Sequence, residues 1–215
     1  MRSSAGLGTR LNKIFNLVSN IQQNSLYNCI WDCCCDHGYL GIKILREDLC
    51  DKLIFVDQVA HIMQGLASRL KPFKSVKHEL ITANAGEISL PDNMRHLVIL
   101  AGVGGERTAD IVNSIESNNP DVNVDYIFCP STSQQALRAY LSPKPFGLID
   151  EYLVGENNRF YEILYVRNNC TDLALPQVSL NCEIWDDFNP DHQRYLSKLK
   201  KHEKQKELAN KFKQF

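Results

Sequence analysis

Two patterns of apolar residues alternate along the first 145 positions of the chain. Short apolar runs, typical of buried strands, are each followed by a stretch in which apolar residues recur every three or four positions, as in an amphipathic helix. Before the first run, an apolar stripe from Leu7 to Ile21 predicts a helix, with Arg10 and Lys13 on its other side. With further helices between them, the runs predict strands near residues 29–34, 53–57, 76–82, 96–101 and 126–129.

The pattern changes near the end of this region. Pro130-Ser131 predicts the start of a helix in which Gln134 closes a capping box on Ser131. Two strand-like runs follow, 146–154 and 159–166, separated by Gly155-Glu156-Asn157-Asn158, which is typical of a hairpin. Five strand-helix units followed by a hairpin predict an α/β fold with the seven-stranded, Rossmann-like sheet of methyltransferases, ending in an antiparallel pair.

Charge separates the C-terminal part of the chain from the rest. We expect a methyltransferase-type domain over residues 1–169 and an extension over residues 170–215, whose one long helix begins at Asn189-Pro190. Residues 190–215 hold eight basic and three acidic residues, whereas the rest of the chain holds 16 basic and 22 acidic residues. A basic helix on an acidic body suits contact with a nucleic-acid backbone, although a solvated lysine-rich helix has the same composition.

The overall composition is ordinary for a globular domain, with 44% hydrophobic and 23% charged residues in a chain of 215. No apolar run approaches the roughly 18 residues that span a bilayer, and the N-terminus has no hydrophobic signal segment. We therefore expect a cytoplasmic protein that does not contact membranes. The composition does not predict an oligomeric state.

The cysteines do not follow a disulfide or metal pattern. Three of the eight are consecutive and most lie in apolar runs, so buried free thiols are expected. Zinc is the alternative for the cysteines near His37, but no spaced Cys-x-x-Cys pair occurs, and successive strand residues point to opposite faces. We expect no metal. The eight residues are Cys29, Cys33, Cys34, Cys35, Cys50, Cys129, Cys170 and Cys182.

The stretch from Cys29 to Leu40 carries the first candidate chemistry. An apolar run stops at small and acidic residues and then restarts with helical spacing, which predicts a strand that turns directly into a helix. In open α/β sheets, ligands bind at the carboxyl ends of such strands. Asp32 at the strand end and Asp36 in the turn would repel a pyrophosphate, but they suit a cofactor with an amino group and a sulfonium, such as S-adenosylmethionine.

Two later strand ends add further candidates. Asp57 closes the second strand, where an acid can accept hydrogen bonds from a ribose diol, and it is equally well placed to cap the next helix. The turn Gly102-Val103-Gly104-Gly105 follows the fourth strand and indicates close backbone approach. A dinucleotide-dependent dehydrogenase would need its third glycine where Arg107 stands, so this alternative is disfavoured.

Three motifs are specific when they occur together: Asp36-His37-Gly38-Tyr39-Leu40, Ala101-Gly102-Val103-Gly104-Gly105 and Asn158-Arg159-Phe160-Tyr161-Glu162-Ile163-Leu164. With them, the chain from about Leu7 to Arg167 resembles TrmK, the bacterial tRNA adenine-N1 methyltransferase family that modifies adenine 22. The resemblance implies S-adenosylmethionine as methyl donor, tRNA as substrate, and methylation of N1 of one adenine.

The resemblance also implies which residues form the site. Cys34 stands where the family usually has glycine, Gly41 where proline is common, and Asn84 where an acid is expected. The residues expected to bind the cofactor are Asp32, Cys34, Asp57, Gln58, Asn84, Ala85, Ala101 and Gly102. Those expected in the catalytic part are Asp36, His37, Tyr39, Gly102, Gly104 and Gly105.

The chemistry of adenine suggests roles for these groups. Its N1 has a lone pair, so methyl transfer needs no general base, but the base must leave its stack. Asp36 would stabilise the developing positive charge or hold the exocyclic amine, with His37 and Tyr39 framing the base. A helix-start histidine and a core tyrosine are the ordinary alternatives. The competing functional class is a non-catalytic protein of the same fold that binds S-adenosylmethionine or RNA.

Overall fold

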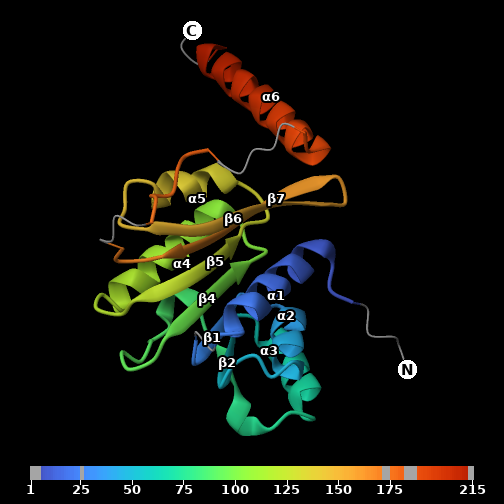
Figure 1. Ribbon diagram of the computed structural model, residues 1–215, viewed down its shortest axis with the longest axis vertical. Coiled ribbons are helices and arrows are strands. Elements are labelled where there is room, and N and C mark those ends of the chain that lie inside the picture. The colour runs from blue at the N-terminus through green and yellow to red at the C-terminus, as the bar shows by residue number, and fades with distance from the viewer. Residues whose placement is uncertain (1–5, 25–26, 171–174, 182–187, 213–215) are drawn as a thin grey trace.

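Seven strands form one sheet in the order β3-β2-β1-β4-β5-β7-β6 (Figure 1). The computed structural model describes residues 6–24, 27–170, 175–181 and 188–212, without the side chains of residues 75 and 202–212. Strands β1 to β5 are parallel, and β7 is antiparallel to both β5 and β6, which confirms the predicted sheet and its terminal hairpin. The strands are β1 (Cys29–Cys33), β2 (Lys52–Asp57), β3 (His78–Thr82), β4 (His96–Ala101), β5 (Val124–Cys129), β6 (Gly147–Glu156) and β7 (Arg159–Arg167).

Helices cover both faces of this sheet. Helices α1, α2 and α3 pack on one face, α4 and α5 pack on the other, and α6 projects away from the sheet (Figure 1). The helices are α1 (Thr9–Gln22), α2 (Tyr39–Arg46), α3 (Ala60–Leu70), α4 (Gly105–Asn118), α5 (Gln134–Leu141) and α6 (Pro190–Phe212), with short 3-10 turns at η1 (Ser75–Lys77) and η2 (Ala85–Glu87).

The central strands are predominantly apolar because both of their faces are buried. Successive side chains point to opposite faces, so neighbouring residues enter different apolar layers. Trp31 and Tyr126 pack in the layer that contains α4 and α5, whereas Ile30 and Phe55 pack in the layer that contains α1, α2 and α3. Continuous apolar runs therefore produced the strand predictions.

The register of the parallel strands aligns three of their carboxyl ends. Cys33 of β1 pairs with Val56 of β2 and with Leu100 of β4, so the loops after these strands leave the sheet at one level. The chain order also reverses here, because β1 lies between β2 and β4. Such a reversal leaves a crevice at the carboxyl edge, where open α/β sheets bind ligands.

The helix predicted to start at Ser131 begins three residues later. Helix α5 starts at Gln134, and its N-cap residue Ser133 makes no capping hydrogen bond through its side chain. The Gln134 side chain instead donates to the carbonyl oxygen of Phe160 in β7, at 3.1 Å. The predicted capping box is wrong because the antiparallel hairpin uses the glutamine amide.

The basic residues Arg10 and Lys13 of α1 contact the terminal hairpin. The guanidinium carbon of Arg10 lies 5.2 Å from the ring centroid of Tyr161, and the Lys13 ammonium lies 3.7 Å from that of Tyr152. Both rings belong to the hairpin. The hairpin therefore covers the side of α1 that carries Arg10 and Lys13.

Helix α6 is attached to the hairpin by its first turns. Asn189 caps it by accepting a hydrogen bond from the Asp191 amide at 2.9 Å, as the Asn189-Pro190 sequence predicted. Tyr195 is 6% exposed, its ring lies 5.5 Å from that of Phe160, and its hydroxyl donates to Glu162. The start of α6 is therefore part of the domain's packing.

A buried charge cluster connects the hairpin to α5 and α6. Arg138 of α5 is 1% exposed and donates to Glu151 and Glu162, in each case over 2.5 Å. It also donates to the carbonyl oxygen of Ser179 at 3.0 Å. Because Glu162 also accepts from Tyr195, one cluster joins α5, β6, β7 and α6.

All cysteines within the described residues are free thiols: Cys29, Cys33, Cys34, Cys35, Cys50, Cys129 and Cys170. Cys182 lies outside the described residues. Within the described part of the chain, no group of three or more His, Cys, Asp or Glu side chains is arranged to hold a metal ion. None of the helices that the described residues form is both long and apolar enough to cross a membrane.

Replacing Arg138 with Met should strongly destabilise the fold. The variant leaves the carboxylates of Glu151 and Glu162 buried without their guanidinium, which costs about 3 to 5 kcal/mol in free energy of unfolding. Urea unfolding followed by circular dichroism measures this loss. As a control, Lys52→Gln removes an exposed ion pair with Glu79 and should cost under about 1 kcal/mol. Equal losses in the two variants would contradict the structural role of the cluster.

Candidate cofactor and substrate site

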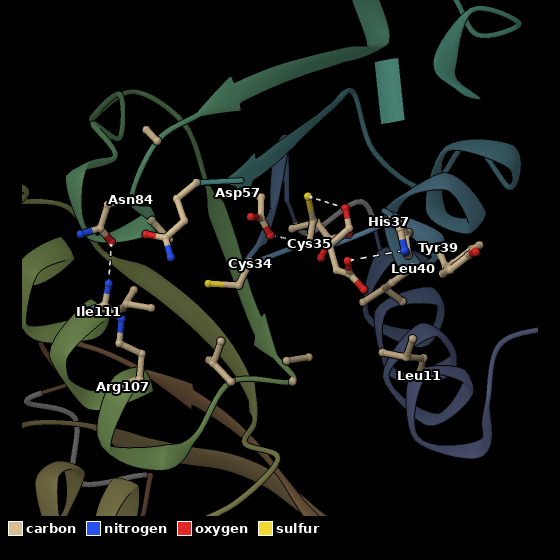
Figure 2. Close-up of a pocket in the computed structure, with 18 of the residues that line it drawn as sticks. Leu11, Cys34, Cys35, His37, Tyr39, Leu40, Asp57, Asn84, Arg107 and Ile111 are labelled. Atoms are coloured by element: carbon tan, nitrogen blue, oxygen red, sulfur yellow. Dashed lines mark hydrogen bonds and ion pairs between the residues drawn. The ribbon is translucent and has the colours of Figure 1, made fainter. Parts of the chain in front are cut away.

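A cavity of about 480 Å³ opens at the carboxyl edge of β1, β2 and β4 (Figure 2). This volume lies within the range of about 300 to 1,000 Å³ that is typical of ligand pockets. Every residue expected to bind the cofactor lines this one cavity: Asp32, Cys34, Asp57, Gln58, Asn84, Ala85, Ala101 and Gly102.

The residues expected in the catalytic part separate into two groups. Asp36, His37, Tyr39 and Gly102 line the cavity, whereas Gly104 and Gly105 are not among its lining residues. The Gly105 amide donates to the carbonyl oxygen of residue 132 at 2.8 Å, and a Cβ added at Gly105 would lie 2.0 Å from the carbonyl oxygen of residue 133. Gly104 and Gly105 thus lie where α4 packs closely against the loop before α5.

The loop after β1 turns sharply through left-handed backbone conformations. Cys34, Asp36 and Gly38 have φ angles of 55°, 50° and 67°. Glycine adopts such angles most easily, which gives a physical reason for the glycine that TrmK sequences usually have at the position of Cys34. The Cys35 amide donates to the carbonyl oxygen of Val56 at 3.2 Å, so the neighbouring strand holds this turn.

Asp32 is a buried carboxyl group at the base of the cavity. It is 5% exposed and accepts a hydrogen bond from the Gly41 amide at 3.0 Å. Burial raises the pKa of the Asp32 carboxyl to about 7, and the nearby Asp57 carboxylate raises it further, against the effect of the Gly41 amide. Proline at position 41 would have no amide hydrogen to donate, so Gly41 gives Asp32 a partner that proline lacks.

Asp57 joins the loops after β1 and β2. One carboxylate oxygen accepts from the Val59 amide and the other from the Asp36 amide, both at 3.0 Å. The first bond orders the approach to α3, which begins at Ala60, and the second holds the β1 loop. Asp57 also lines the cavity, so its two predicted roles, helix entry and ligand contact, are compatible.

Asn84 and Arg107 lie together at one end of the cavity (Figure 2). The Asn84 side-chain oxygen accepts from the Gly86 amide at 3.1 Å and from the Arg107 guanidinium at 3.4 Å. These bonds fix the plane of the Asn84 amide, whose donor and acceptor groups suit the edge of a purine.

The opposite end of the cavity carries an exposed aromatic side chain. Tyr39 is 52% exposed, and its ring centroid lies 5.8 Å from that of His37 in an edge-on arrangement (Figure 2). Arg69 of α3 donates to the His37 carbonyl oxygen at 3.1 Å and places its guanidinium 5.0 Å from the Tyr39 ring. The ordinary alternative of a core tyrosine is therefore wrong.

Three basic residues were missed by the sequence patterns: Arg10 and Arg107, which line the cavity, and Arg69, which supports its rim. Arg107 had a usable signal, because it lies in the first turn of the helix after β4. Arg10 and Arg69 had no local signal, since their positions depend on packing between helices and distant strands.

Comparison with known proteins places this chain in a defined family. The model of the methyltransferase domain matches residues 7–164. A Mycoplasma genitalium protein proposed to be a tRNA methyltransferase is 24% identical over 158 residues, which are 73% of this chain and 69% of that protein.

Solved structures with the same fold include two TrmK proteins. The m1A22 tRNA methyltransferase TrmK of B. subtilis has a TM-score of 0.64 at 17% identity, covering 76% of this chain and 67% of that chain. TrmK of M. capricolum, solved with S-adenosyl-homocysteine, has a TM-score of 0.64 at 20% identity, covering 76% and 70%.

The raised pKa of Asp32 predicts a specific dependence of stability on pH. A carboxyl with a pKa of about 7 in the folded state and 3.8 as its ordinary value favours folding at low pH, and this contribution is lost as pH rises toward 7. Asp32→Asn stays neutral and retains an acceptor for Gly41. Relative to the variant, the parent should lose roughly 1 kcal/mol of free energy of unfolding per pH unit between pH 5 and pH 7, because the slope of about 1.4 kcal/mol per unit falls to half at the folded pKa.

Urea unfolding of both proteins at pH 5, 6 and 7 measures this difference. Subtracting one protein from the other removes the contributions of the remaining ionisable groups. A difference that stays constant with pH would show that the Asp32 pKa is not raised.

Proposed function

The chain belongs to the methyltransferase-domain family, and from this premise we propose that it transfers a methyl group from S-adenosylmethionine to N1 of an adenine in tRNA, with adenine 22 as the target. One observation carries the proposal. Eight residues assigned to the cofactor from the sequence line a single cavity at the point where the strand order reverses. The relatives named above support tRNA as the substrate class.

The cavity suits S-adenosylmethionine by charge and by shape. The Asp57 carboxylate favours a cation and disfavours a pyrophosphate, and a cation bound beside Asp32 would favour the ionised form of that carboxyl. Asp57 lies at the end of β2, where it can accept from ribose hydroxyls, and the Asn84 amide can pair with an adenine edge. At Gly102, with a φ of 103°, the backbone turns without a side chain that would narrow the space.

When bound, the cofactor supplies a methyl group activated by a positively charged sulfur. The protein must then place the adenine N1 lone pair in line with that methyl group, and no residue has to remove a proton before attack. Asp36, whose side chain is 66% exposed, is available to face the base that enters. Its carboxylate would stabilise the positive charge that develops on the ring.

N1 lies on the pairing edge of adenine, so the nucleotide must leave its stack to reach the cavity. Tyr39 offers an exposed ring at the mouth, and its contacts with His37 and Arg69 hold that ring in place. Stacking on such a ring compensates part of the cost of extruding the base. We assign His37 and Tyr39 to framing the adenine.

Helix α6 is our candidate for contact with the tRNA backbone. It is rich in lysine, and it projects away from the sheet beyond the hairpin (Figure 1). Lys200 and Lys201 are exposed, whereas Lys198 donates to the carbonyl oxygen of Asn158 at 2.9 Å. The first turns of the helix would therefore fix its direction while later lysines contact phosphates.

Asp36→Asn should retain cofactor binding and lower turnover about ten- to a thousandfold, because one positioned charge is lost while the hydrogen bond from the Asp36 amide to Asp57 remains.

Tyr39→Ala should raise the tRNA KM and lower turnover together, consistent with about 1 to 3 kcal/mol for one stacked base. The measurements are calorimetry with S-adenosylmethionine and single-turnover formation of 1-methyladenosine in unmodified tRNA.

Tyr39→Phe is the matched control, since it keeps the ring and should keep tRNA affinity. Full activity of both Asp36→Asn and Tyr39→Ala would exclude this loop from catalysis. A parent protein that binds S-adenosylmethionine but forms no 1-methyladenosine on any tRNA would favour the non-catalytic alternative.

Removing residues 202–215 should weaken tRNA binding without changing turnover at saturating tRNA. This truncation leaves Tyr195 and its contacts in place, and it removes Lys204, Lys206, Lys211 and Lys213. Each lost phosphate contact should lower the slope of log affinity against log salt by about 0.7 to 0.9.

Filter binding at several salt concentrations measures the slope. Lys71→Gln combined with Lys74→Gln provides the control, because these exposed lysines follow the C-terminal end of α3. An unchanged slope in the truncated protein would make α6 a structural element without a role in tRNA binding.

A further inference from the structure

Arg69 is a cation at the rim of the cavity that the proposed roles use only as a support for its neighbours. It lies in the last turn of α3, and the residue is exposed. Among the described residues, no carboxylate lies within ion-pair distance of its guanidinium. The charge of Arg69 is therefore available to a partner that arrives from solution.

Two contacts hold the Arg69 guanidinium at this rim. One terminal nitrogen donates to the carbonyl oxygen of His37 at 3.1 Å, and the guanidinium carbon lies 5.0 Å from the centroid of the Tyr39 ring. The hydrogen bond to His37 uses one N–H group, so the remaining N–H groups of the guanidinium can donate to a further acceptor. A side chain that is held before binding loses less conformational entropy when it binds.

The charges of the cavity make a cation at its mouth necessary for an RNA substrate. Asp36 and Asp57 line the cavity, and the Asp36 side chain is 66% exposed, so a phosphate that approaches the mouth is repelled. A guanidinium beside the mouth offsets this repulsion. Arg69 lies beside Tyr39, the ring that we assign to the target base.

An aromatic ring with a cation beside it is how many proteins bind single-stranded nucleic acid. The ring stacks on the base, and the cation contacts the phosphate backbone, which fixes the position of the strand. Base, sugar and phosphate are joined by covalent bonds. A nucleotide whose base lies against Tyr39 therefore keeps its phosphates close to the side chain that touches the same ring.

We propose that Arg69 binds a phosphate next to the target adenosine while Tyr39 holds its base, an inference that rests on the proposed function. The extruded nucleotide would then be held at two points, the base and the backbone. The guanidinium would keep its hydrogen bond to the His37 carbonyl oxygen, so one side chain would connect the RNA strand to the loop after β1.

Salt dependence separates a phosphate contact from an effect that acts through Tyr39. Arg69→Gln should lower the slope of log tRNA affinity against log salt by about 0.7 to 0.9, so the parent's advantage in affinity should fall about threefold between about 50 and 200 mM salt. Arg69→Lys keeps the charge and should keep the slope. Tyr39→Ala removes no charge, so it should weaken tRNA binding without changing the slope.

A neutral linkage in the RNA identifies the phosphate. Replacing the phosphate on one side of the target adenosine with a methylphosphonate removes one negative charge from the tRNA. If Arg69 contacts that phosphate, the neutral linkage and Arg69→Gln together should cost no more affinity than either alone, because both remove the same contact. Filter binding of parent and variant to both forms of the tRNA measures this coupling for each of the two linkages.

Lys71→Gln is the matched control, because it removes the next cation along the chain, which is also exposed. This variant should keep the parent's slope and the parent's response to the neutral linkage. Neither Arg69 nor Lys71 is among the residues that line the cavity, so calorimetry should give the parent's affinity for S-adenosylhomocysteine in both variants. Circular dichroism establishes that each variant is folded.

Three results would overturn the assignment. An unchanged slope in Arg69→Gln, with tRNA affinity lowered as in Tyr39→Ala, would make Arg69 a support for the ring alone. Additive losses at both neutral linkages would show that Arg69 contacts neither phosphate of the target nucleotide. A parent protein that binds S-adenosylhomocysteine but no tRNA would reject the proposed function itself, and with it this inference.

Discussion

The site depends on the position of β1 between two parallel neighbours in register. Because Cys33 pairs with Val56 and Leu100, three strands end at one level, and the residues after them meet even though they are far apart in sequence. The central strands bury both faces, so the polar groups of the cavity lie at the carboxyl ends of the strands and in the loops that follow them. The Asp57 carboxylate, the Asn84 amide and the turn at Gly102 therefore all lie at this edge of the sheet.

Asp57 links this edge to the shape of the β1 loop. Non-glycine residues in left-handed conformations cost about 1 to 3 kcal/mol each, and both Cys34 and Asp36 adopt them. The bonds from the Asp36 amide to Asp57 and from the Cys35 amide to Val56 offset part of that cost. The carboxylate that would hold the ribose of the cofactor therefore also holds the loop that would face the target adenine. Asp57 would in this way couple cofactor binding to the geometry of the β1 loop.

The sequence predicted most of what depends on local pattern. β4 begins and ends at the predicted residues, and the eight residues expected to bind the cofactor line one cavity, because strand ends and their loops are set by short apolar runs. It failed where distant segments decide the outcome. Gln134 caps nothing because β7 takes its amide, and Arg10 points into the cavity because the hairpin packs on its helix. No pattern within α1 contains that information.

The hairpin forms one edge of the sheet and also positions two helices. Glu156 and Tyr161 position the first turn of α1, while Phe160 and Glu162 position the first turns of α6. The first turns of α1 and α6, which are far apart in sequence, are thus both held by the hairpin. The buried Arg138 holds Glu162 in turn, so the charge cluster behind the sheet fixes the direction of α6 relative to the cavity mouth. An RNA that contacts α6 would then meet the site in an orientation set by the fold, which is the requirement for placing one adenine, and not its neighbours, over the cofactor.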